Sequence, residues 1–351
     1  MSSADPTYPL YPISCTLAAA MLLLTLLTSI IRQSWNLGVA LLCFWLCLEN
    51  VTYAVNTVLW ADNADARLYV YCGIVTRLQL LCYVIKPMST LIITRRLYLI
   101  ASLQSVDLPS ASQRRRNSIL EWTAGLLIPI IVAGPLYYVV QPYRFQITRG
   151  FGCANPAEGS VLAILLVDIW GIVPPLLSVL VYYPRVVGTF VSHGRAVNEF
   201  LRSNGSVSRT NYMRILALAS VDVVLTLPMG ITFLVLQIFS KDESLPFYRG
   251  WSTVHAHWDI VHHVDTIDSR AGSAQAYFSH WASPVLAFTI FALFGMTAEA
   301  RASYAKFLRA VVGRCRRTSP RTSKDNGRFQ SDSIVFASRP QEYSPDSDPI
   351  I

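Results

Sequence analysis

The chain has 351 residues, of which 53% are hydrophobic and only 14% are charged, and its formal net charge is +8. Soluble domains carry about 25% charged residues, so this composition argues against a soluble multidomain protein and for a membrane protein. The basic residues lie between long apolar stretches, which makes lipid headgroups and cytosolic proteins better partners than nucleic acid.

Seven apolar stretches are long enough to cross the hydrocarbon core of a membrane as helices, which takes about 20 residues. In chain order they are Leu10–Ile31, Asn36–Trp60, Tyr69–Ile100, Ser118–Val140, Ser160–Val187, Tyr212–Phe239 and Ala274–Ala298. No basic residue precedes the first stretch, which favours a spanning helix over a cleaved signal peptide. The third stretch is the weakest because Arg77 and Lys86 interrupt it. Without it, six spans would place both termini on one side.

The distribution of Lys and Arg decides between six and seven spans, because cytosolic loops carry an excess of these residues. With seven spans and the N-terminus outside, 21 of the 29 Lys and Arg residues fall on the inner side and 6 on the outer side. With six spans this bias largely disappears. The sequence therefore predicts an all-α, integral membrane, seven-transmembrane helix bundle with its N-terminus outside.

The predicted topology divides the chain into four parts. Residues 1–9 form an extracellular N-terminus, and residues 10–298 form the bundle. Residues 299–313 carry apolar side chains at helical spacing among basic ones, which predicts an amphipathic juxtamembrane helix. Residues 314–351 are rich in Ser, Pro, Arg and Asp and are expected to be a disordered cytosolic tail. Cys315 lies in a basic run there and is a candidate for palmitoylation.

Five charged residues fall at membrane depth, where an unpaired charge costs about 3 kcal/mol. At about 1.5 Å per helical residue, Arg77 has the depth of Asp168 in the outer half, and Lys86 has the depth of Asp222 in the inner half. Glu49, near the middle of its span, competes with Asp222 for Lys86. Two interpretations stay open. Either the expected ion pairs Arg77–Asp168 and Lys86–Asp222 only join helices, or they form a ligand-facing outer pair and an inner lock whose rupture marks activation.

Cys72 and Cys153 are predicted to form a disulfide. Cys72 is near the outer end of the third span and Cys153 is in the loop before the fifth, so both face the oxidising side of the membrane. The bridge would hold this loop over the mouth of the bundle; the alternative is two free thiols. The loop at 251–268 is rich in His, but it lacks conventional metal-ligand spacing, so no metal site is expected.

Motifs of nucleotide-binding proteins, zinc proteases and serine hydrolases are absent from the sequence, so we expect no enzyme activity and no cofactor. Seven spans leave three classes of protein. A retinal protein needs a lysine in the last span, which has none. A secondary transporter would use Arg77/Asp168 and Lys86/Asp222 as a polar site, but no internal repeat is evident. A G-protein-coupled receptor needs basic inner loops for an acidic cytosolic partner, and these are present.

Three groups of residues carry a resemblance to a known family. They are Trp35 to Gly38 with Trp45 and Val55 to Trp60, Tyr71 to Ile74 with Arg95 to Tyr98, and Ala287 to Gly295 with Glu299 and Tyr304. By their order and spacing, the chain resembles the fungal mating-pheromone receptors that recognise lipidated (farnesylated) peptides, a class D G-protein-coupled receptor family. The resemblance spans roughly residues 8 to 310. Gly73 stands where the family usually has an acidic residue.

The resemblance implies a multi-pass receptor of the plasma membrane that binds a farnesylated peptide pheromone and signals through a heterotrimeric G protein. It leaves open whether the receptor forms a homodimer. The peptide would bind in the outer half of the bundle, where aromatic residues are also expected as membrane-interface anchors. The candidate ligand contacts are Asn56, Trp60, Tyr71, Arg77, Asp168, Trp170, Tyr277 and Trp281. The candidate inner lock is Glu49, Lys86 and Asp222. The candidate G-protein contacts are Arg95, Arg96, Arg114, Arg115, Arg116 and Arg214.

Overall fold

The structure is a computed structural model. It describes residues 6–31, 36–102, 110–192, 209–239, 245–264, 270–297, 300–302, 304 and 309. The chain divides into two units, Met1–Ala305 and Lys306–Ile351. Everything below concerns the first unit, because position 309 alone is described in the second. The predicted disordered tail and Cys315 lie outside the described residues, as does most of the predicted juxtamembrane helix.

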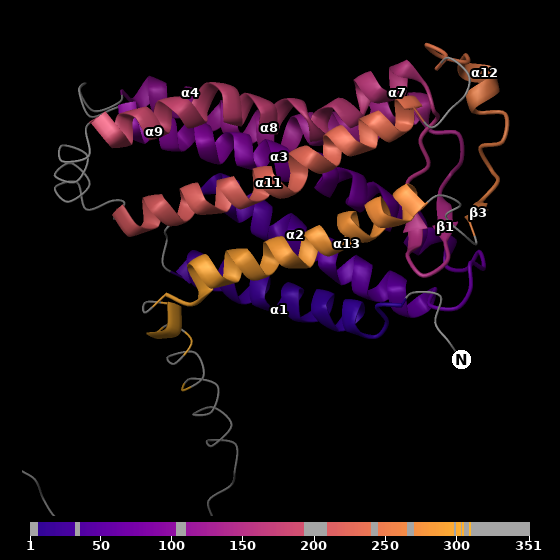
Figure 1. The fold of residues 1–351 in the computed structure, drawn as a ribbon, viewed down its shortest axis with the longest axis horizontal. Coiled ribbons are helices and arrows are strands. Elements are labelled where there is room, and N and C mark those ends of the chain that lie inside the picture. Colours follow the sequence, from indigo (N-terminus) through magenta and orange to yellow (C-terminus); the bar gives the residue numbers. More distant parts are fainter. Residues whose placement is uncertain are drawn as a thin grey trace, which may run out of the picture. The chain divides into compact units, whose positions relative to one another are not determined.

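The described residues form a bundle of seven helical passes (Figure 1). The first three are single helices: α1 (Leu10–Ile31), α2 (Leu37–Leu59) and α3 (Tyr69–Ser102). The fourth pass consists of α4 (Ala111–Trp122), η2 (Thr123–Leu127), α5 (Ile128–Ile131), η3 (Val132–Leu136) and α6 (Tyr137–Val140). The fifth consists of α7 (Val161–Leu166), η4 (Asp168–Gly171), α8 (Val173–Leu177), η5 (Ser178–Tyr182) and α9 (Tyr183–Ser192). The sixth is α11 (Arg209–Phe239), and the seventh is α13 (Arg270–Ile290) followed by η6 (Phe291–Gly295).

Prolines explain why the fourth and fifth passes change helix type along their length. Proline lacks the backbone N–H and clashes with the preceding turn, so an α-helix has to adjust around it. Pro129 and Pro135 lie in the fourth pass, where π-helical turns occur on both sides of α5. Pro174 and Pro175 begin α8, directly after the 3-10 turn η4. The fifth pass is therefore interrupted at the depth of Asp168.

Six of the passes are long and apolar enough to cross a membrane by length and composition, and α3 is the pass outside this set. Charged side chains lower its hydropathy, but its 34 residues exceed the roughly 20 that a span needs. Helix α3 packs against α2, α8, α9 and α11, so its charges lie among other helices. The buried apolar core of this region includes Leu22, Leu42, Ile93, Leu218 and Ile290, which come from five different helices.

A small sheet lies at one end of the bundle, near the start of α1 (Figure 1). It contains β1 (Gln146–Thr148), β2 (Gly152–Ala154) and β3 (His262–Val264), in the order β2-β1-β3. Strands β1 and β2 form an antiparallel hairpin in which Ile147 faces Cys153, and β3 runs parallel to β1. Gly150 and Gly152 adopt φ values of 81° and 79°, which only glycine adopts without strain. The sequence analysis predicted a loop here and missed these strands.

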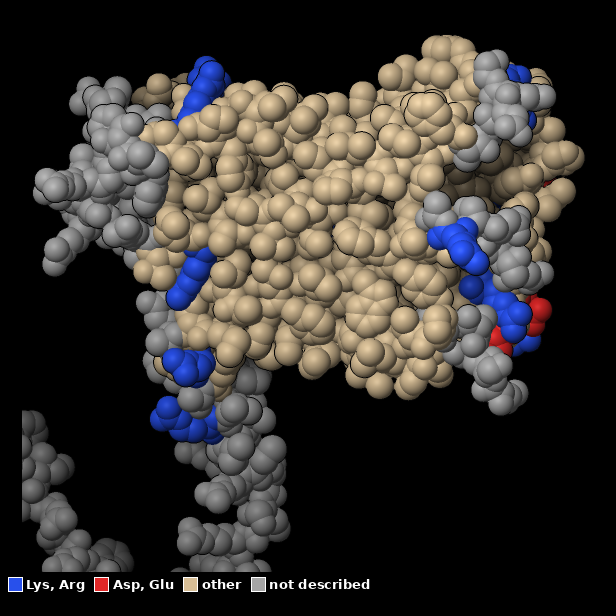
Figure 2. Space-filling model, viewed as in Figure 1, with Lys and Arg blue, Asp and Glu red and all other residues tan. Residues whose placement is uncertain are grey.

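The surface separates an apolar belt from charged ends. Figure 2 shows Lys and Arg side chains at the two ends of this face and none across its middle. Large apolar side chains such as Leu17, Leu24 and Leu27 of α1 are more than 40% exposed, as expected for a surface that faces lipid. The first pass starts at the end with the sheet, and the seventh pass ends at the opposite end (Figure 1). An odd number of passes therefore places the two ends of the bundle on different sides.

Candidate functional site

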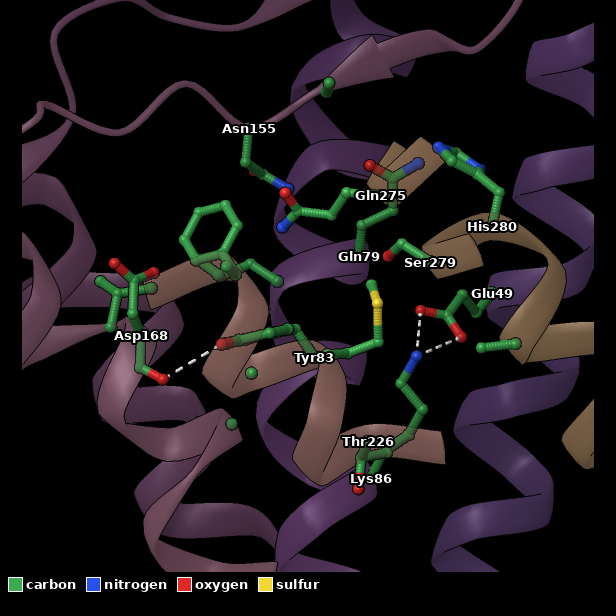
Figure 3. A pocket seen from close by; sticks show the side chains of 18 of the residues that line it. Glu49, Gln79, Tyr83, Lys86, Asn155, Asp168, Thr226, Gln275, Ser279 and His280 are labelled. Carbon is green, nitrogen blue, oxygen red and sulfur yellow. Dashed lines mark hydrogen bonds and ion pairs between the residues drawn. The ribbon is translucent and has the colours of Figure 1, made fainter. Parts of the chain in front are cut away.

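A cavity of about 350 Å³ lies between the helices, next to the hairpin (Figure 3). Its volume is in the range of small-molecule sites, about 300–1,000 Å³. The lining comes from α2, α3, α6, η4, α11, α13, the β1–β2 hairpin and the chain after β2. The polar and charged lining residues are Glu49, Gln79, Lys86, Asn155, Asp168, Thr226, Gln275, Ser279 and His280. The aromatic lining residues are Tyr53, Tyr83, Tyr137, Phe151 and Phe233.

The hairpin closes one end of this cavity. Phe151, in its turn, stacks on His280 of α13 with ring centroids 4.5 Å apart, and meets Tyr277 edge to face at 5.3 Å. Cys153 of β2 forms a disulfide with Cys72 of α3, and the two Cα atoms are 5.4 Å apart. The covalent link and the aromatic contacts together hold the hairpin against both α3 and α13.

The deeper part of the cavity contains an ion pair between Lys86 of α3 and Glu49 of α2. The Lys86 ammonium donates to both carboxylate oxygens of Glu49 at 2.9 Å. Ser283 of α13 donates to Glu49 at 2.8 Å, and Tyr53 donates at 3.3 Å. Asn50 in turn donates to Ser283 at 3.0 Å. This network connects α2, α3 and α13, and it satisfies a carboxylate whose side chain is 2% exposed.

The expected ion pair between Arg77 and Asp168 is not formed, so this prediction is wrong. Arg77 donates to Gln141 at 2.5 Å and to the Ala133 carbonyl at 3.1 Å, and its guanidinium lies 4.9 Å from the centre of the Tyr137 ring. It therefore points at the fourth pass. Equal depth in the membrane did not fix the rotation of α3, which decides the direction of the side chain.

The expected pair between Lys86 and Asp222 is also not formed, and its competitor Glu49 takes Lys86 instead. Asp222 of α11 accepts a hydrogen bond from Thr90, one turn further along α3. With neither charge pair present, the polar site on which the transporter interpretation depended is lost.

Asp168 lies on the opposite side of the cavity from the Lys86–Glu49 pair (Figure 3). Its backbone carbonyl accepts a hydrogen bond of 3.2 Å from the Tyr83 hydroxyl. The residue is 6% exposed, and its carboxylate oxygen Oδ2 has no hydrogen-bond partner among the described residues. The side chain of Gln237 hydrogen-bonds this carboxyl group.

Comparison with known proteins assigns the family. Residues 10–315 match the family model described as Pheromone A receptor. The chain belongs to the pheromone A receptor family. The family is one of receptors and not of enzymes, and the chain is a multi-pass membrane protein.

Curated relatives carry matching names. The chain is 30% identical over 315 residues to Pheromone B alpha 2 receptor of Schizophyllum commune. The aligned region covers 88% of this chain and 48% of that protein. It is 27% identical to Pheromone receptor 2 of Mycosarcoma maydis over 89% of each chain. It is 22% identical to Pheromone a factor receptor of Saccharomyces cerevisiae over 79% of this chain and 57% of that one. The chain spans about half the length of the Schizophyllum relatives that it matches.

Most candidate ligand contacts of this family member do not line the cavity. Trp60 is 1% exposed and donates to the Asp65 carbonyl at 3.0 Å, and its ring stacks on Tyr71. Tyr71 donates to Asn56, which donates to the Cys153 carbonyl. This cluster of Asn56, Trp60 and Tyr71 contacts the hairpin and supports it. Of the eight candidates, Asp168 lines the cavity.

The remaining aromatic candidates have protein partners of their own. Trp170 donates to the Leu166 carbonyl at 3.0 Å within the fifth pass. Trp281 packs against Tyr11 of α1 at 5.3 Å, and Tyr277 contacts Phe151 at the closed end of the cavity. These residues join helices or hold the hairpin in the structure.

The sequence analysis missed several polar lining residues. Gln275 and Ser279 line the cavity, and Ser283 hydrogen-bonds Glu49. The three recur every four residues in α13, and this spacing places them on one face of the helix. Three polar side chains along one face of an otherwise apolar span were a usable signal. Gln79 of α3 is a further polar residue of this kind, whereas Phe151 and Asn155 come from a loop whose fold no pattern announced.

The candidate G-protein contacts lie toward the bundle end away from the sheet. Arg95 donates to Asn117 of α4 at 2.8 Å. Arg114, Arg115 and Arg116 are exposed in the first turns of α4, which begins with a capping box between Ser110 and Gln113. Arg96 and Arg214 are half-buried.

The histidine side chains of the 251–268 loop that the structure describes contact neighbouring residues. His255 stacks on Trp251, His262 stacks on Tyr143, and the ring Nδ1 of His263 lies 2.6 Å from the Ala64 carbonyl oxygen. Within the described ranges, no group of three or more His, Cys, Asp or Glu side chains is arranged to hold a metal ion.

Proposed function

We propose that this chain is a plasma-membrane receptor for a mating pheromone, a peptide that carries a farnesyl group. The observation that carries the proposal is the family match over residues 10–315, which includes every helical pass and the whole cavity. The relatives in three fungi are named as pheromone receptors. The lipid on the peptide follows from the resemblance described above.

The Lys86–Glu49 network is the proposed inner lock. It lies at the deep end of the cavity and ties α2 to α3 and α13. Tyr53 lines the cavity and also donates to Glu49, so a ligand that displaces the Tyr53 ring would alter this network. A ligand that favours one helix packing over another shifts the population of the two packings. Thr90 lies one turn after Lys86 on α3. Its hydrogen bond to Asp222 of α11 extends the lock toward the inner end.

The signalling partner is the proposed heterotrimeric G protein, which would bind at the inner end. The exposed arginines of α4 give this end a positive surface, which favours approach of an acidic protein. In the same orientation the C-terminus is cytosolic, and palmitoylation of Cys315 would anchor the segment after the bundle to the membrane.

A mating reporter tests the function. The chain is expressed in a fungal strain that lacks its own pheromone receptor and carries a reporter driven by the pheromone response. The cells are challenged with a panel of synthetic pheromone-like peptides, each made with and without the farnesyl group. We expect at least one farnesylated peptide to activate the reporter, and its unmodified twin to be inactive.

Two results would contradict the proposal. Equal activation by the unmodified twin would remove the lipidated ligand. Silence toward the whole panel, with the receptor present at the cell surface, would remove the receptor function itself. Cells with the empty vector control for peptide effects on the host.

A further inference from the structure

Asp168 gives the cavity a carboxyl group without a counter-charge. The charged residues that line the cavity are Glu49, Lys86 and Asp168, with His280 counted as neutral. Glu49 and Lys86 neutralise each other through two hydrogen bonds. Asp168 is 6% exposed. The Gln237 side chain hydrogen-bonds its carboxyl group, but the oxygen Oδ2 has no hydrogen-bond partner among the described residues. Burial of a carboxylate is costly unless a cation or several donors compensate it.

The fold holds Asp168 at a fixed position. It begins the 3-10 turn η4, which interrupts the fifth pass before the prolines of α8. The Tyr83 hydroxyl donates to its backbone carbonyl at 3.2 Å. A Cβ atom on Gly230 of α11 would lie 3.0 Å from the Gly171 carbonyl oxygen, so α11 packs directly against this turn. The backbone of Asp168 is therefore held between α3 and α11.

The rest of the lining combines aliphatic side chains, such as Leu80, Val167 and Leu225, with groups that can bind a cation. Four aromatic rings border the cavity together with Tyr53, and ring faces attract ammonium and guanidinium groups. They belong to Tyr83, Tyr137, Phe151 and Phe233. The side-chain amides of Gln79, Asn155 and Gln275 also line it, and such groups hydrogen-bond a peptide.

We propose that this cavity binds a cationic group of the ligand, an ammonium or a guanidinium, through an ion pair with Asp168. The inference rests on the proposed function only in naming the ligand. If the ligand is a peptide pheromone, the group is its N-terminal amine or a basic side chain.

Small cations test the site without any pheromone. The thermal unfolding of the purified full-length receptor is followed against increasing benzylammonium, with neutral benzyl alcohol of similar shape as the reference compound. Benzylguanidinium in a parallel series distinguishes the two kinds of cation. We expect benzylammonium or benzylguanidinium to stabilise the wild type, with Asp168→Asn needing at least about a ten-fold higher concentration for the same shift, since hydrogen bonds to charged groups are worth this much. Benzyl alcohol should act equally on both proteins.

Glu158→Gln is the matched control, because it makes the same neutral change at a buried carboxylate that does not line the cavity and already has Arg249 as a partner at 3.6 Å. It should keep the wild-type response to the cations. Asp168→Asn should itself fold, because it replaces a carboxyl group that lacks a counter-charge without changing the shape of the side chain. The inference is overturned if neither cation stabilises the wild type, or if Asp168→Asn responds at the same concentrations as the wild type.

The two proposals fail in different ways. If a farnesylated peptide activates the reporter while the cations leave the purified receptor unchanged, the receptor function stands and the cation site falls. If the cations bind through Asp168 while no peptide activates the reporter, the cation site stands and the pheromone function falls.

Discussion

The Lys86–Glu49 pair combines burial with four donated hydrogen bonds at a single carboxylate. The side chains are 17% and 2% exposed, so neither charge can be rescued by solvent or headgroups when its partner is removed. Removal of one member of a buried pair leaves an uncompensated charge, whereas replacement of both members by uncharged side chains is often nearly neutral. This asymmetry makes the pair testable.

We predict that Glu49→Gln lowers the unfolding free energy by about 3–5 kcal/mol, because it leaves the Lys86 ammonium buried without a counter-charge. Chemical or thermal unfolding of the purified receptor measures the loss. The double variant Glu49→Gln/Lys86→Met should recover much of it. The matched control is Asp65→Asn, which removes the exposed pair with Arg67 and should cost less than about 1 kcal/mol. Similar losses in Glu49→Gln and Asp65→Asn would contradict the assignment.

The role of this pair as the inner lock gives a separate prediction. The double variant Glu49→Gln/Lys86→Met lacks the ion pair without carrying a stranded charge, so it should reach the cell surface. We expect it to raise reporter output in the absence of any peptide, because the packing that the pair favours is weakened. Surface quantification by an epitope tag corrects for expression. Unchanged basal output at equal surface level would show that the pair only joins the helices.

At this scale the sequence predicted which residues need partners, but only partly which partners they take. Cost at membrane depth singled out Glu49, Lys86 and Asp168, all of which line the cavity. The predicted partner of Arg77 was wrong because depth fixes only the position of a side chain along the helix axis. The rotation of the helix about that axis fixes the direction in which the side chain points. Rotation depends on packing between helices, which a single sequence does not encode in a readable pattern.

Between elements, the hairpin depends on one covalent bond and on close contact with α2. We predict that Cys72→Ser, Cys153→Ser and the double variant lower stability equally, by about 2–5 kcal/mol, because all three remove the same bond. Thermal unfolding of the purified proteins measures this. Cys47→Ser is the control, since that thiol donates only to the Ala19 carbonyl and a hydroxyl can do the same. Additive losses in the double cysteine variant would mean that the two residues act independently.

Close packing of α2 on α3 gives a prediction with a matched glycine pair. A Cβ atom on Gly38 would lie 3.0 Å from the Ser89 carbonyl oxygen and 2.7 Å from Ile93, so Gly38→Val should lower the unfolding free energy by about 1–3 kcal/mol. Gly73, inside α3, has nothing within 4 Å of the same position. Gly73→Ala should therefore be neutral or stabilising by about 0.5–1 kcal/mol. Thermal unfolding of the two variants side by side decides, and equal destabilisation would contradict the packing.

The elements themselves were largely readable from the sequence. Hydropathy located six passes, the distribution of Lys and Arg supported the remaining pass α3, and α1 has the predicted bounds. The sheet was not readable, because strands of three residues held by a disulfide and glycine turns need no alternating pattern. The pair Pro174 and Pro175 marks a break in the fifth pass, but it does not give the direction in which Asp168 points.

For the whole molecule, seven passes and the distribution of arginine support one orientation. The disulfide-linked hairpin and the cavity lie toward one end, and the exposed arginines of α4 lie toward the other. Disulfides persist on the outer side of the membrane, and Lys and Arg accumulate on the cytosolic side. These two independent arguments favour an orientation with the proposed ligand site outside and the proposed G-protein surface inside.

The central claim is that an odd number of spans separates an outer ligand site from an inner signalling surface. Epitope tags at the two ends of the chain, stained in intact and in permeabilised cells, test it most directly. The account predicts that antibody reaches the N-terminal tag in intact cells and the C-terminal tag only after permeabilisation. Staining of both tags under the same condition would place the termini on one side and contradict the receptor architecture.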